Sequence, residues 1–467
     1  MSELDTLIAG GTVVTPWGVH ELDIGVQAGR ISQLAASPSG LRAREKVDAS
    51  GYIVFPGGVD PHVHFENPSM GTVTAHDFAI GTEAAALGGT TCVIDFAFQT
   101  PEESPLETLK RRRALADPQV VIDYGLHGCM TRVDAASIAD IPRLVEYGCP
   151  STKVFMVYEQ EGWMVGDGDL VSIMTRMADV DATLLVHAEN EALLQWGIAD
   201  RVKHGDLRPR AHARSRPAIV EVEAIRRAIY FAHETGCQLF IVHMSTRGGA
   251  EAVRQGRAVG ANVQAETCAH YLVLDDSIMD RPDGHRYVMS PPLRSVADQE
   301  ALWQGLGDAS IASVGSDDAA YWERFKARGE NDFREIANGI PGVQARVPIL
   351  FSSGVLEGRL TLQRFVDAVS TQPAKLFGLY PRKGVIAPGS DADLVIYDTK
   401  AKWRMTPEAM HTNIEYTCYE DREVTGRPLH VWSRGRRVVD GGQLVGARGW
   451  GQFLTRQTVK WNGGEQS

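Results

Sequence analysis

The sequence predicts an α/β fold in which a TIM-like (β/α)8 barrel is combined with a β-sandwich domain formed by both termini. Apolar, β-branched runs alternate with helix-like segments through the middle of the chain, and both ends read as short strands punctuated by glycine. Side chains of the kinds that bind metals stand where several central runs end. We therefore assign residues 1–54 and 386–448 to the sandwich, 55–385 to the catalytic barrel, and 449–467 to a tail that packs on the sandwich or contacts another subunit.

The composition is that of an ordinary globular protein and argues against some partners. A chain of 467 residues is long enough for a barrel of ~250–350 residues and a smaller domain. Its formal net charge of −12 leaves no basic surplus to neutralise phosphates, which argues against nucleic acid or an anionic membrane surface. No apolar run approaches ~18 residues and the start lacks a signal-peptide pattern, so we expect a cytoplasmic protein. The six scattered cysteines, without a CxxC pair, are expected to be reduced and buried.

Both ends of the chain have the same strand-like alternation of apolar and polar residues. Leu7–Val14 and Leu22–Val26 alternate, or nearly alternate, apolar and polar residues, and Ala392–Asp398 and Val431–Val439 repeat this pattern near the other end. Two all-β ends that flank a different middle indicate one small sandwich built from both.

Eight strands are expected in the middle, with helices between them; Glu221–Ala232, for example, carries apolar residues at helical spacing. The expected strands are Gly58–His64, Thr90–Phe96, Val120–Leu126, Thr152–Val157, Thr183–Ala188, Leu239–Met244, Asn262–Glu266 and Ile311–Ser316. A doubly wound sheet with an extra domain is the competing fold. It does not explain why ligand-type residues end five of these strands, whereas the active site of a barrel lies at those carboxyl ends.

The first strand ends in two histidines separated by one residue. Because side chains alternate between faces along a strand, Asp60, His62 and His64 should all point into the barrel mouth. Neutral imidazoles suit Zn, Mn, Fe or Co as ligands, and a chance pair in a loop is the alternative interpretation.

Three further candidates, His187, His243 and Asp317, end the fifth, sixth and eighth strands. Each histidine alone could equally be a core or rim residue, and the aspartate could be a helix cap. Their coincidence on separate strands of one barrel predicts a single metal site at its mouth.

Lys153 lies in the fourth strand and should point to the same mouth. A protonated amine beside divalent ions would be repelled, but a desolvated neutral amine can be carboxylated by CO2. The resulting carbamate has two oxygens and suits bridging two metals ~3.5–4 Å apart. A buried lysine paired with an acid is the other interpretation.

Short motifs follow one another along nearly the whole chain. They are Phe55–Phe65, Gly88–Phe96, Lys153–Tyr158, Val186–Asn190, Ser215–Pro217, Val242–Ser245, Glu266–Cys268, Tyr287–Arg294, Val314–Asp317, Asn338–Gly342, Gln372–Phe377, Ala387–Asp393 and Gly449–Leu454. In this order they resemble the cyclic amidohydrolases, most closely the dihydropyrimidinase and D-hydantoinase group.

The resemblance implies two divalent metal ions per chain, usually Zn²⁺ with Mn²⁺ or Co²⁺ as alternatives. The implied ligands are His62, His64, Lys153, His187, His243 and Asp317. The first two histidines and Asp317 would hold the more buried ion, and the other two histidines would hold the more exposed one. A CO2-derived carbamate on Lys153 would bridge them.

The resemblance also assigns residues to the substrate. It implies that Tyr158 donates to the developing oxyanion, that Asp317 moves a proton to the leaving nitrogen, and that backbone groups of Ser290 and Asn338 hold the ring. Taken alone, Tyr158 would be a core aromatic and the other two would be turn residues.

The implied activity is that of a hydrolase acting on C–N bonds in cyclic amides. It would open a dihydropyrimidine or a 5-substituted hydantoin to an N-carbamoyl amino acid, as a homotetramer or homodimer. Allantoinase is the alternative function. A non-catalytic dihydropyrimidinase-like scaffold is a remote one, because all six ligand positions are present.

Two features depart from the family pattern. A histidine commonly follows the metal-binding aspartate, whereas Asp318 stands here, so either an extra negative charge lies near the metals or this side chain turns away. Glu159 and Glu161 fall in a loop that usually carries apolar lid residues, which leaves the substrate range open.

Overall fold

The computed structural model describes residues 3–461 and confirms the predicted fold class. Eight parallel strands form the barrel wall: β6 (Gly58–Val63), β9 (Thr90–Phe98), β10 (Asp123–Cys129), β11 (Ser151–Phe155), β12 (Thr183–His187), β13 (Gln238–Ile241), β14 (Val263–Cys268) and β15 (Ser313–Gly315). A bridge between Val63 and Asp318 links the two edge strands, so the barrel is nearly closed. These strands are buried almost throughout, as expected for a sheet covered on both faces.

The strand β10 begins three residues later than predicted. Val120 and Ile122 are buried, like strand residues, but they lie outside the ladder. The carbonyl of Val120 instead accepts a hydrogen bond from Gly451 N–H in the tail at 3.1 Å. The apolar pattern therefore predicted correctly that these residues are buried. The strand starts later because Val120 bonds to the distant tail and not to a neighbouring strand.

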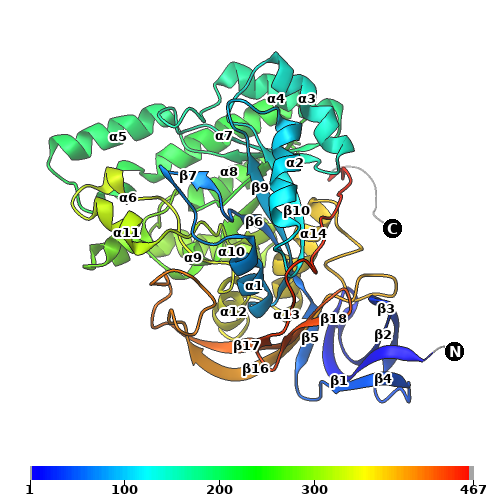
Figure 1. The fold of residues 1–467 in the computed structure, drawn as a ribbon. Helices are drawn as coiled ribbons and strands as arrows, with labels where there is room; N and C mark the ends of the chain where they lie inside the picture. The colour runs from blue at the N-terminus through cyan, green and yellow to red at the C-terminus, as the bar shows by residue number, and fades with distance from the viewer. Residues whose placement is uncertain (1–2, 462–467) are drawn as a thin grey trace.

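Helices cover the outside of the barrel (Figure 1). The longer ones are α1 (Phe78–Leu87), α2 (Pro105–Ala116), α3 (Ala135–Glu146), α4 (Asp167–Asp179), α5 (Glu191–Lys203), α7 (Ala218–Thr235), α8 (Arg247–Ala258) and α10 (Val296–Gly307). The shorter ones are α6 (Ala211–Ser215), α9 (Ala269–Val273), α11 (Glu323–Lys326), α12 (Arg346–Ile349), α13 (Leu362–Val366) and α14 (Gln372–Leu376). Single turns complete the set: η1 (Asp276–Asp280), η2 (Gly284–Tyr287), η3 (Ala327–Gly329), η4 (Phe333–Glu335), η5 (Leu350–Val355) and η6 (Asp367–Thr371).

Local signals explain where several helices begin and end. Ser104 and Glu107 form a reciprocal capping box at the start of α2. The expected helix over Glu221–Ala232 is the centre of α7, which ends at Gly236 with a φ of 72°. Within the described chain, none of the helices has the length and apolar character needed to cross a bilayer.

Strands from both termini form one nine-stranded sheet beside the barrel. They are β1 (Leu4–Thr15), β2 (Gly18–Gln27), β3 (Arg30–Ala36), β4 (Ala43–Asp48), β5 (Ile53–Pro56), β16 (Leu394–Arg404), β17 (Glu423–Ser433), β18 (Arg436–Asp440) and β19 (Gln443–Leu444). The strand β5 pairs with β1 on one side and β16 on the other, so it joins the blue and orange ends of the chain in Figure 1. The expected run Val431–Val439 is the end of β17, a turn at Arg434 and Gly435, and β18.

The tail lies against its own barrel. Tyr124 N–H donates to Gln452 O at 3.0 Å, and Leu454 N–H donates back to Tyr124 O at 2.7 Å. The ring of Phe453 packs on Tyr124, and the Arg434 guanidinium lies 4.3 Å from the ring centre of Trp450. The tail aromatics therefore contact both the barrel and the terminal sheet of the same chain.

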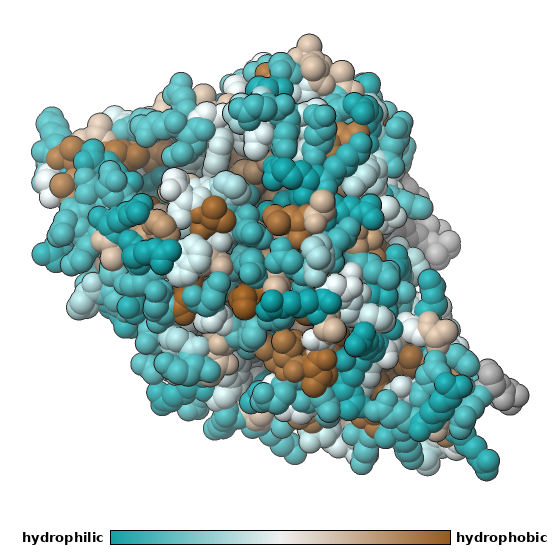
Figure 2. All heavy atoms as spheres, in the orientation of Figure 1, coloured by the Kyte–Doolittle hydropathy of each residue, from teal (hydrophilic) through white to brown (hydrophobic). Residues whose placement is uncertain are grey.

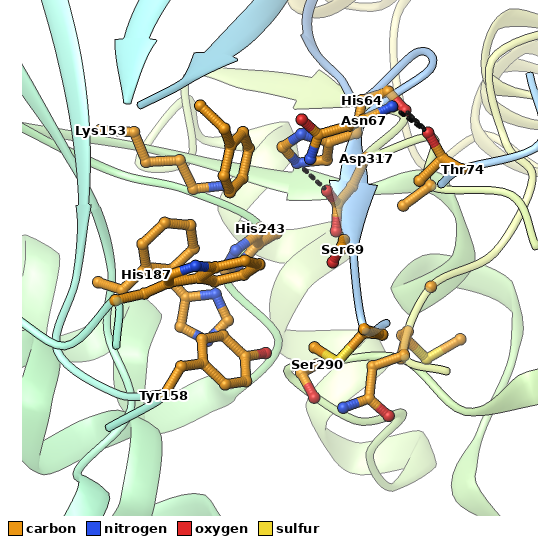
Figure 3. A pocket seen from close by; sticks show the side chains of 18 of the residues that line it. His64, Asn67, Ser69, Thr74, Lys153, Tyr158, His187, His243, Ser290 and Asp317 are labelled. Carbon is orange, nitrogen blue, oxygen red and sulfur yellow. Dashed lines mark hydrogen bonds and ion pairs between the residues drawn. The ribbon is translucent and has the colours of Figure 1, made fainter. Parts of the chain in front are cut away.

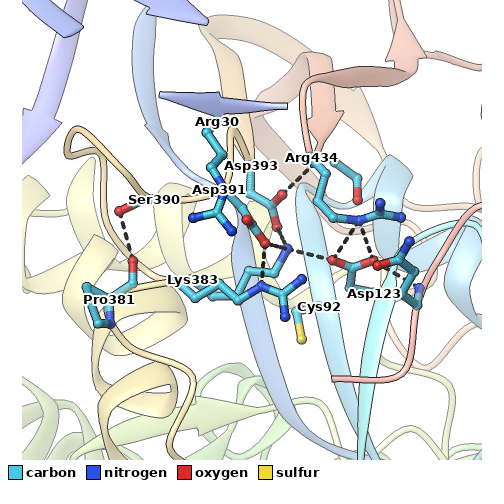
Figure 4. A network of polar contacts seen from close by, with 12 residues as sticks. Arg30, Cys92, Asp123, Pro381, Lys383, Ser390, Asp391, Asp393 and Arg434 are labelled. Carbon is cyan, nitrogen blue, oxygen red and sulfur yellow. Dashed lines mark hydrogen bonds and ion pairs between the residues drawn. The ribbon is translucent and has the colours of Figure 1, made fainter. Parts of the chain in front are cut away.

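A buried ionic cluster joins the barrel, the terminal sheet and the tail (Figure 4). Lys383 Nζ lies 2.7 Å from Asp123 on β10, 2.7 Å from Asp393 and 3.1 Å from Asp391. Arg434 also binds Asp123, at 3.0 Å. Burial alone would lower the pKa of Lys383, but the three carboxylates outweigh it and raise that pKa.

Replacing Lys383 with methionine should strongly destabilise the fold. The change leaves buried carboxylates without their shared cation, which costs about 3–5 kcal/mol. Chemical denaturation would measure it, with exposed Lys110→Met as the control that stays within about 0.5 kcal/mol of the parent. Equal stability of the two variants would show that the cluster does not hold the two parts together.

Candidate metal centre and active site

The six predicted ligand residues converge at the carboxyl ends of the barrel strands, and Figure 3 shows five of them. A hollow opens there, with about 520 Å³ of space that includes the open solvent at its mouth. Five of the six line it: His64, Lys153, His187, His243 and Asp317. The sixth, His62, is fully buried behind them, with its Nε2 3.2 Å from His64 Nε2. The three residues predicted to hold the substrate, Tyr158, Ser290 and Asn338, line the same hollow.

Four ligand residues form an inner group, and the two outer histidines lie next to it, with the ligand atom of His243 still within 4.8 Å of those of His62 and Asp317. His62 Nε2 lies 3.1 Å from Asp317 Oδ1 and 2.9 Å from Lys153 Nζ. His64 Nε2 lies 3.3 Å from the same Asp317 oxygen. The rings of His187 and His243 lie 4.6 Å apart on neighbouring strands. Within the inner group, Lys153 lies on the strand next to the one that carries His187.

The backbone is strained where it presents these side chains. Tyr158, His243 and Asp317 have φ values of 74°, 38° and 50°, in the left-handed region that non-glycine residues rarely adopt. Such a conformation costs of order 1–3 kcal/mol per residue and persists only where surrounding contacts enforce it. Asp317 N–H donates to His62 O at 2.9 Å, which ties the end of β15 to the end of β6.

The donor set fits a divalent cation. His62 Nδ1 lies 2.5 Å from Glu266 Oε1, and an N–H directed there leaves the Nε2 lone pair facing His64, Asp317 and Lys153. Histidine ligands of metals typically donate their second N–H to a carboxylate in this way. His187 Nε2 likewise lies 2.9 Å from Glu189, which leaves its Nδ1 free for a ligand.

Burial favours the uncharged forms of His62 and Lys153. Burial, and next the nearby Lys153 amine, lower the pKa of His62 well below its ordinary value. Burial also lowers the pKa of Lys153, against an opposing effect of Asp317. Neutral imidazoles and a neutral amine are the forms that bind metals, or that react with CO2 in the case of the amine.

The Asp318 side chain turns away from this hollow, which decides between the two alternatives left by the sequence. Its Oδ1 lies 2.8 Å from His76 Nδ1, and its Oδ2 accepts from Gly342 and Val343 N–H at 2.8 and 3.0 Å. Burial acts to raise the pKa of Asp318, but His76 and these backbone groups outweigh it and lower that pKa. The extra carboxylate therefore has its hydrogen-bond partners outside the ligand set.

The loop that carries Glu159 and Glu161 still provides an apolar lid. Trp163 packs on Phe98 and Phe155, with ring centroids 5.2 and 5.4 Å away, and lines the hollow. Both glutamates are exposed and lie outside this inner hollow. The walls nearest the ligand residues are consequently aromatic.

Several residues at the site were not singled out from the sequence. Glu266 ends the seventh strand expected from the sequence, so the same strand-end rule that found the histidines would have found it. The others line the hollow from loops or, for Ser69, from the two-residue strand β7 (Pro68–Ser69), and carry no comparable signal: Asn67, Ser69, Met70, Thr74, Trp163, Met289 and Tyr321.

Comparison with known proteins gives consistent matches over nearly the full length. A model described as the amidohydrolase family matches residues 53–438. A D-hydantoinase from Geobacillus stearothermophilus is 40% identical over 454 residues, which cover 96% of each chain. The crystal structure of dihydropyrimidinase from Brevibacillus agri NCHU1002 matches with a TM-score of 0.95 at 37% identity, covering 97% of this chain and 99% of that one. L-hydantoinase from Arthrobacter aurescens matches with a TM-score of 0.91 at 30% identity, covering 97% and 100%.

Replacing Glu266 with glutamine should weaken Zn²⁺ binding about 10–100-fold, because a neutral amide orients and polarises His62 less well than a carboxylate. Competition with a chelating dye measures the affinity. Glu221→Gln is the matched control, since that buried carboxylate binds Ser245 and Arg294 instead of a ligand histidine. Equal Zn²⁺ affinity in the two variants would contradict the role given to Glu266.

Proposed function

This chain belongs to the amidohydrolase family, and we propose that it opens the ring of a cyclic ureide or amide by metal-dependent hydrolysis. The substrate class is a dihydropyrimidine or a 5-substituted hydantoin, and the product is an N-carbamoyl amino acid. The observation that carries the proposal is the convergence of the six ligand residues with Tyr158, Ser290 and Asn338 around one hollow. The names of the D-hydantoinase and the dihydropyrimidinase that match almost the whole chain support this class.

The proposed cofactor is a pair of divalent ions, Zn²⁺ or alternatively Mn²⁺ or Co²⁺. The inner group would hold one ion and the outer histidines the other, with a carbamate on Lys153 between them. The Lys153 amine lies beside His62, and burial lowers its pKa, which supports this assignment. When bound, the ions lower the pKa of water towards neutrality and polarise the scissile carbonyl.

The side chains around the hollow have distinct tasks in this reaction. Burial, and next Glu189, raise the pKa of Tyr158, so its phenol stays protonated and can donate to the oxyanion. Asp317 accepts the proton of the attacking water and delivers it to the leaving nitrogen. Backbone groups of Ser290 and Asn338 hold the ring, while Trp163 keeps bulk water away from it.

The alternative functions are less well supported. The full-length matches carry hydantoinase and dihydropyrimidinase names, so allantoinase is not favoured. A scaffold without activity would have no need of six converging donors or of strained backbone at two of them.

The proposed assembly is a cytoplasmic homotetramer, with a homodimer as the alternative. Apolar side chains gather over α5 in Figure 2, where Trp196 is 66% exposed, and Tyr230 on the neighbouring α7 is 60% exposed. Large apolar side chains left in water are typical of surfaces that meet another subunit.

Ring-opening rates on dihydrouracil, 5-substituted hydantoins and allantoin, measured side by side, test the function. The metal-loaded protein should convert the first two classes and leave allantoin nearly unchanged. Asp317→Asn is the control, because it removes the proton carrier and should lower the rate at least ~100-fold. A protein that holds two ions per chain and converts none of these compounds would overturn the proposal.

Replacing Lys153 with alanine should lower the ring-opening rate at least ~1000-fold, because the bridge between the two ions is lost. Metal analysis should show fewer than two ions per chain. After reconstitution with ¹³C-bicarbonate, a carbamate signal in the ¹³C spectrum should be present in the parent protein and absent from the variant. Lys383→Met, which changes another buried lysine, should keep that signal; full activity of Lys153→Ala would exclude the bridging role.

A further inference from the structure

Lys326 is a fully buried cation whose partners are all backbone carbonyl groups. Its Nζ donates to Val288 O at 2.7 Å, to Ala337 O at 2.8 Å and to Gly339 O at 2.8 Å. Within residues 3–461, no carboxylate forms an ion pair with it. Burying an ammonium group without a counter-ion is expensive, so stability alone gives no reason to prefer it to a neutral side chain of similar shape.

The three carbonyls belong to the two loops that carry the proposed substrate-holding residues. Val288 lies two residues before Ser290, and the other two acceptors flank Asn338. Gly339 N–H also donates to Val288 O, at 3.1 Å, which joins the loops directly. A Cβ at Gly339, where φ is 151°, would lie 2.4 Å from Ala319 O, so this loop is packed closely against the end of the barrel.

The Lys326 ammonium polarises the peptide group whose N–H, that of Asn338, has no protein acceptor in the described residues. The carbonyl of Ala337 and the N–H of Asn338 belong to one peptide group, so a cation on the oxygen makes the N–H a stronger donor. In the part of the chain that the structure describes, neither Asn338 N–H nor Ser290 N–H is used in a hydrogen bond. The amide oxygen of Asn338 is also without a partner there. These groups are available to a ligand in the hollow that both residues line.

We propose that Lys326 is a positioning residue for ring opening: its ammonium sets the spacing of the Ser290 and Asn338 loops and strengthens the Asn338 N–H toward the cyclic amide. This inference rests on the proposed function. The lysine itself does not touch the substrate, and its effect is on how tightly the ring is held.

Protonation of Lys326 links this positioning to pH. Burial lowers the pKa of Lys326 to about 7, against smaller opposing effects of Cys418 and Glu323. Above that pH the neutral amine has two N–H groups and a lone pair, so one of the three carbonyls loses its donor. The spacing then relaxes, and KM should rise as the pH increases through about 7.

Stability should change in the opposite direction. In the unfolded chain this lysine titrates near its ordinary value of 10.5, so between about 7 and 10.5 the unfolded state binds more protons. The contribution of Lys326 to stability therefore increases with pH over this window. A general loosening of the loops would instead raise KM and lower stability together.

The titratable and charged groups around the ammonium are Glu323 with its partners His285 and Arg286, and Tyr287, His212 and Cys418. The last three do not account for such a change. Burial raises the pKa of Tyr287 to about 12 and raises that of the Cys418 thiol. Burial lowers the pKa of His212 well below its ordinary value, so that ring stays neutral above pH 7.

The test is steady-state kinetics from about pH 6 to about pH 10 on the parent protein, Lys326→Met and Lys326→Arg, with metal content and unfolding measured for each. We expect Lys326→Met to raise KM about tenfold at neutral pH, with a smaller change in kcat and little pH dependence of KM. Lys326→Arg, which stays charged, should keep KM within about threefold of the parent and lose its rise with pH. Lys383→Met is the control: another buried lysine whose loss should reduce stability and leave KM unchanged.

Each outcome decides the matter. An unchanged KM in folded, metal-loaded Lys326→Met would overturn this inference alone, and so would a parent KM that stays flat between about pH 7 and about pH 9. If Lys326→Met does not fold, the dependence of the parent KM on pH still tests the inference. Absence of ring opening by the metal-loaded parent would overturn the proposed function and this inference with it.

Discussion

The strongest constraint on this molecule is that electron-rich side chains from distant strands are held together in one buried barrel mouth. His62 Nε2 has an amine nitrogen at 2.9 Å and a carboxylate oxygen at 3.1 Å, with almost no access to water. Such a cluster is stable only if each group is oriented by something behind it. Glu266 and Glu189 orient two of the histidines, and β15 leads into a strained turn that presents Asp317. Parallel strands of a closed barrel meet this demand because their carboxyl ends all reach one rim.

The same demand explains the polar network outside the ligand set. Asp318 follows a ligand directly, yet its two oxygens are fully used by His76 and by two backbone N–H groups. It thereby ties the end of the eighth strand to the loop before α1 and to the segment before α12. Lys326 makes corresponding contacts by donating to carbonyls of the two loops that carry Ser290 and Asn338. In both places a buried charged group holds loops at the rim, where secondary structure provides no ladder.

The periodicity of the sequence was enough to predict the eight barrel strands and the contribution of both termini to a second sheet. The strand-end rule identified His187, His243 and Asp317, because it depends only on where an apolar run stops. It could have picked out Glu266 as well, but it did not reveal the pairings behind the ligands: Glu266 is 204 positions from His62, and the partner of Asp318 is 242 positions away. Contacts over such separations depend on the closure of the barrel, which no local pattern encodes. The boundary of β10 was missed for the same reason, since a residue of the tail completes it.

The cluster around Asp123 has a consequence for the order in which the molecule can be completed during synthesis. This carboxylate emerges early, whereas its partners Lys383, Arg434 and Gln452 follow 260, 311 and 329 positions later. Until they arrive, the third barrel strand carries an unpaired charge at a position that is fully buried in the finished protein. In a partly translated chain this region should therefore stay exposed to water, because burying the unpaired Asp123 carboxylate would be costly. The barrel can close fully only when nearly the whole polypeptide has been made. The slow formation of distant contacts therefore comes at the end of translation.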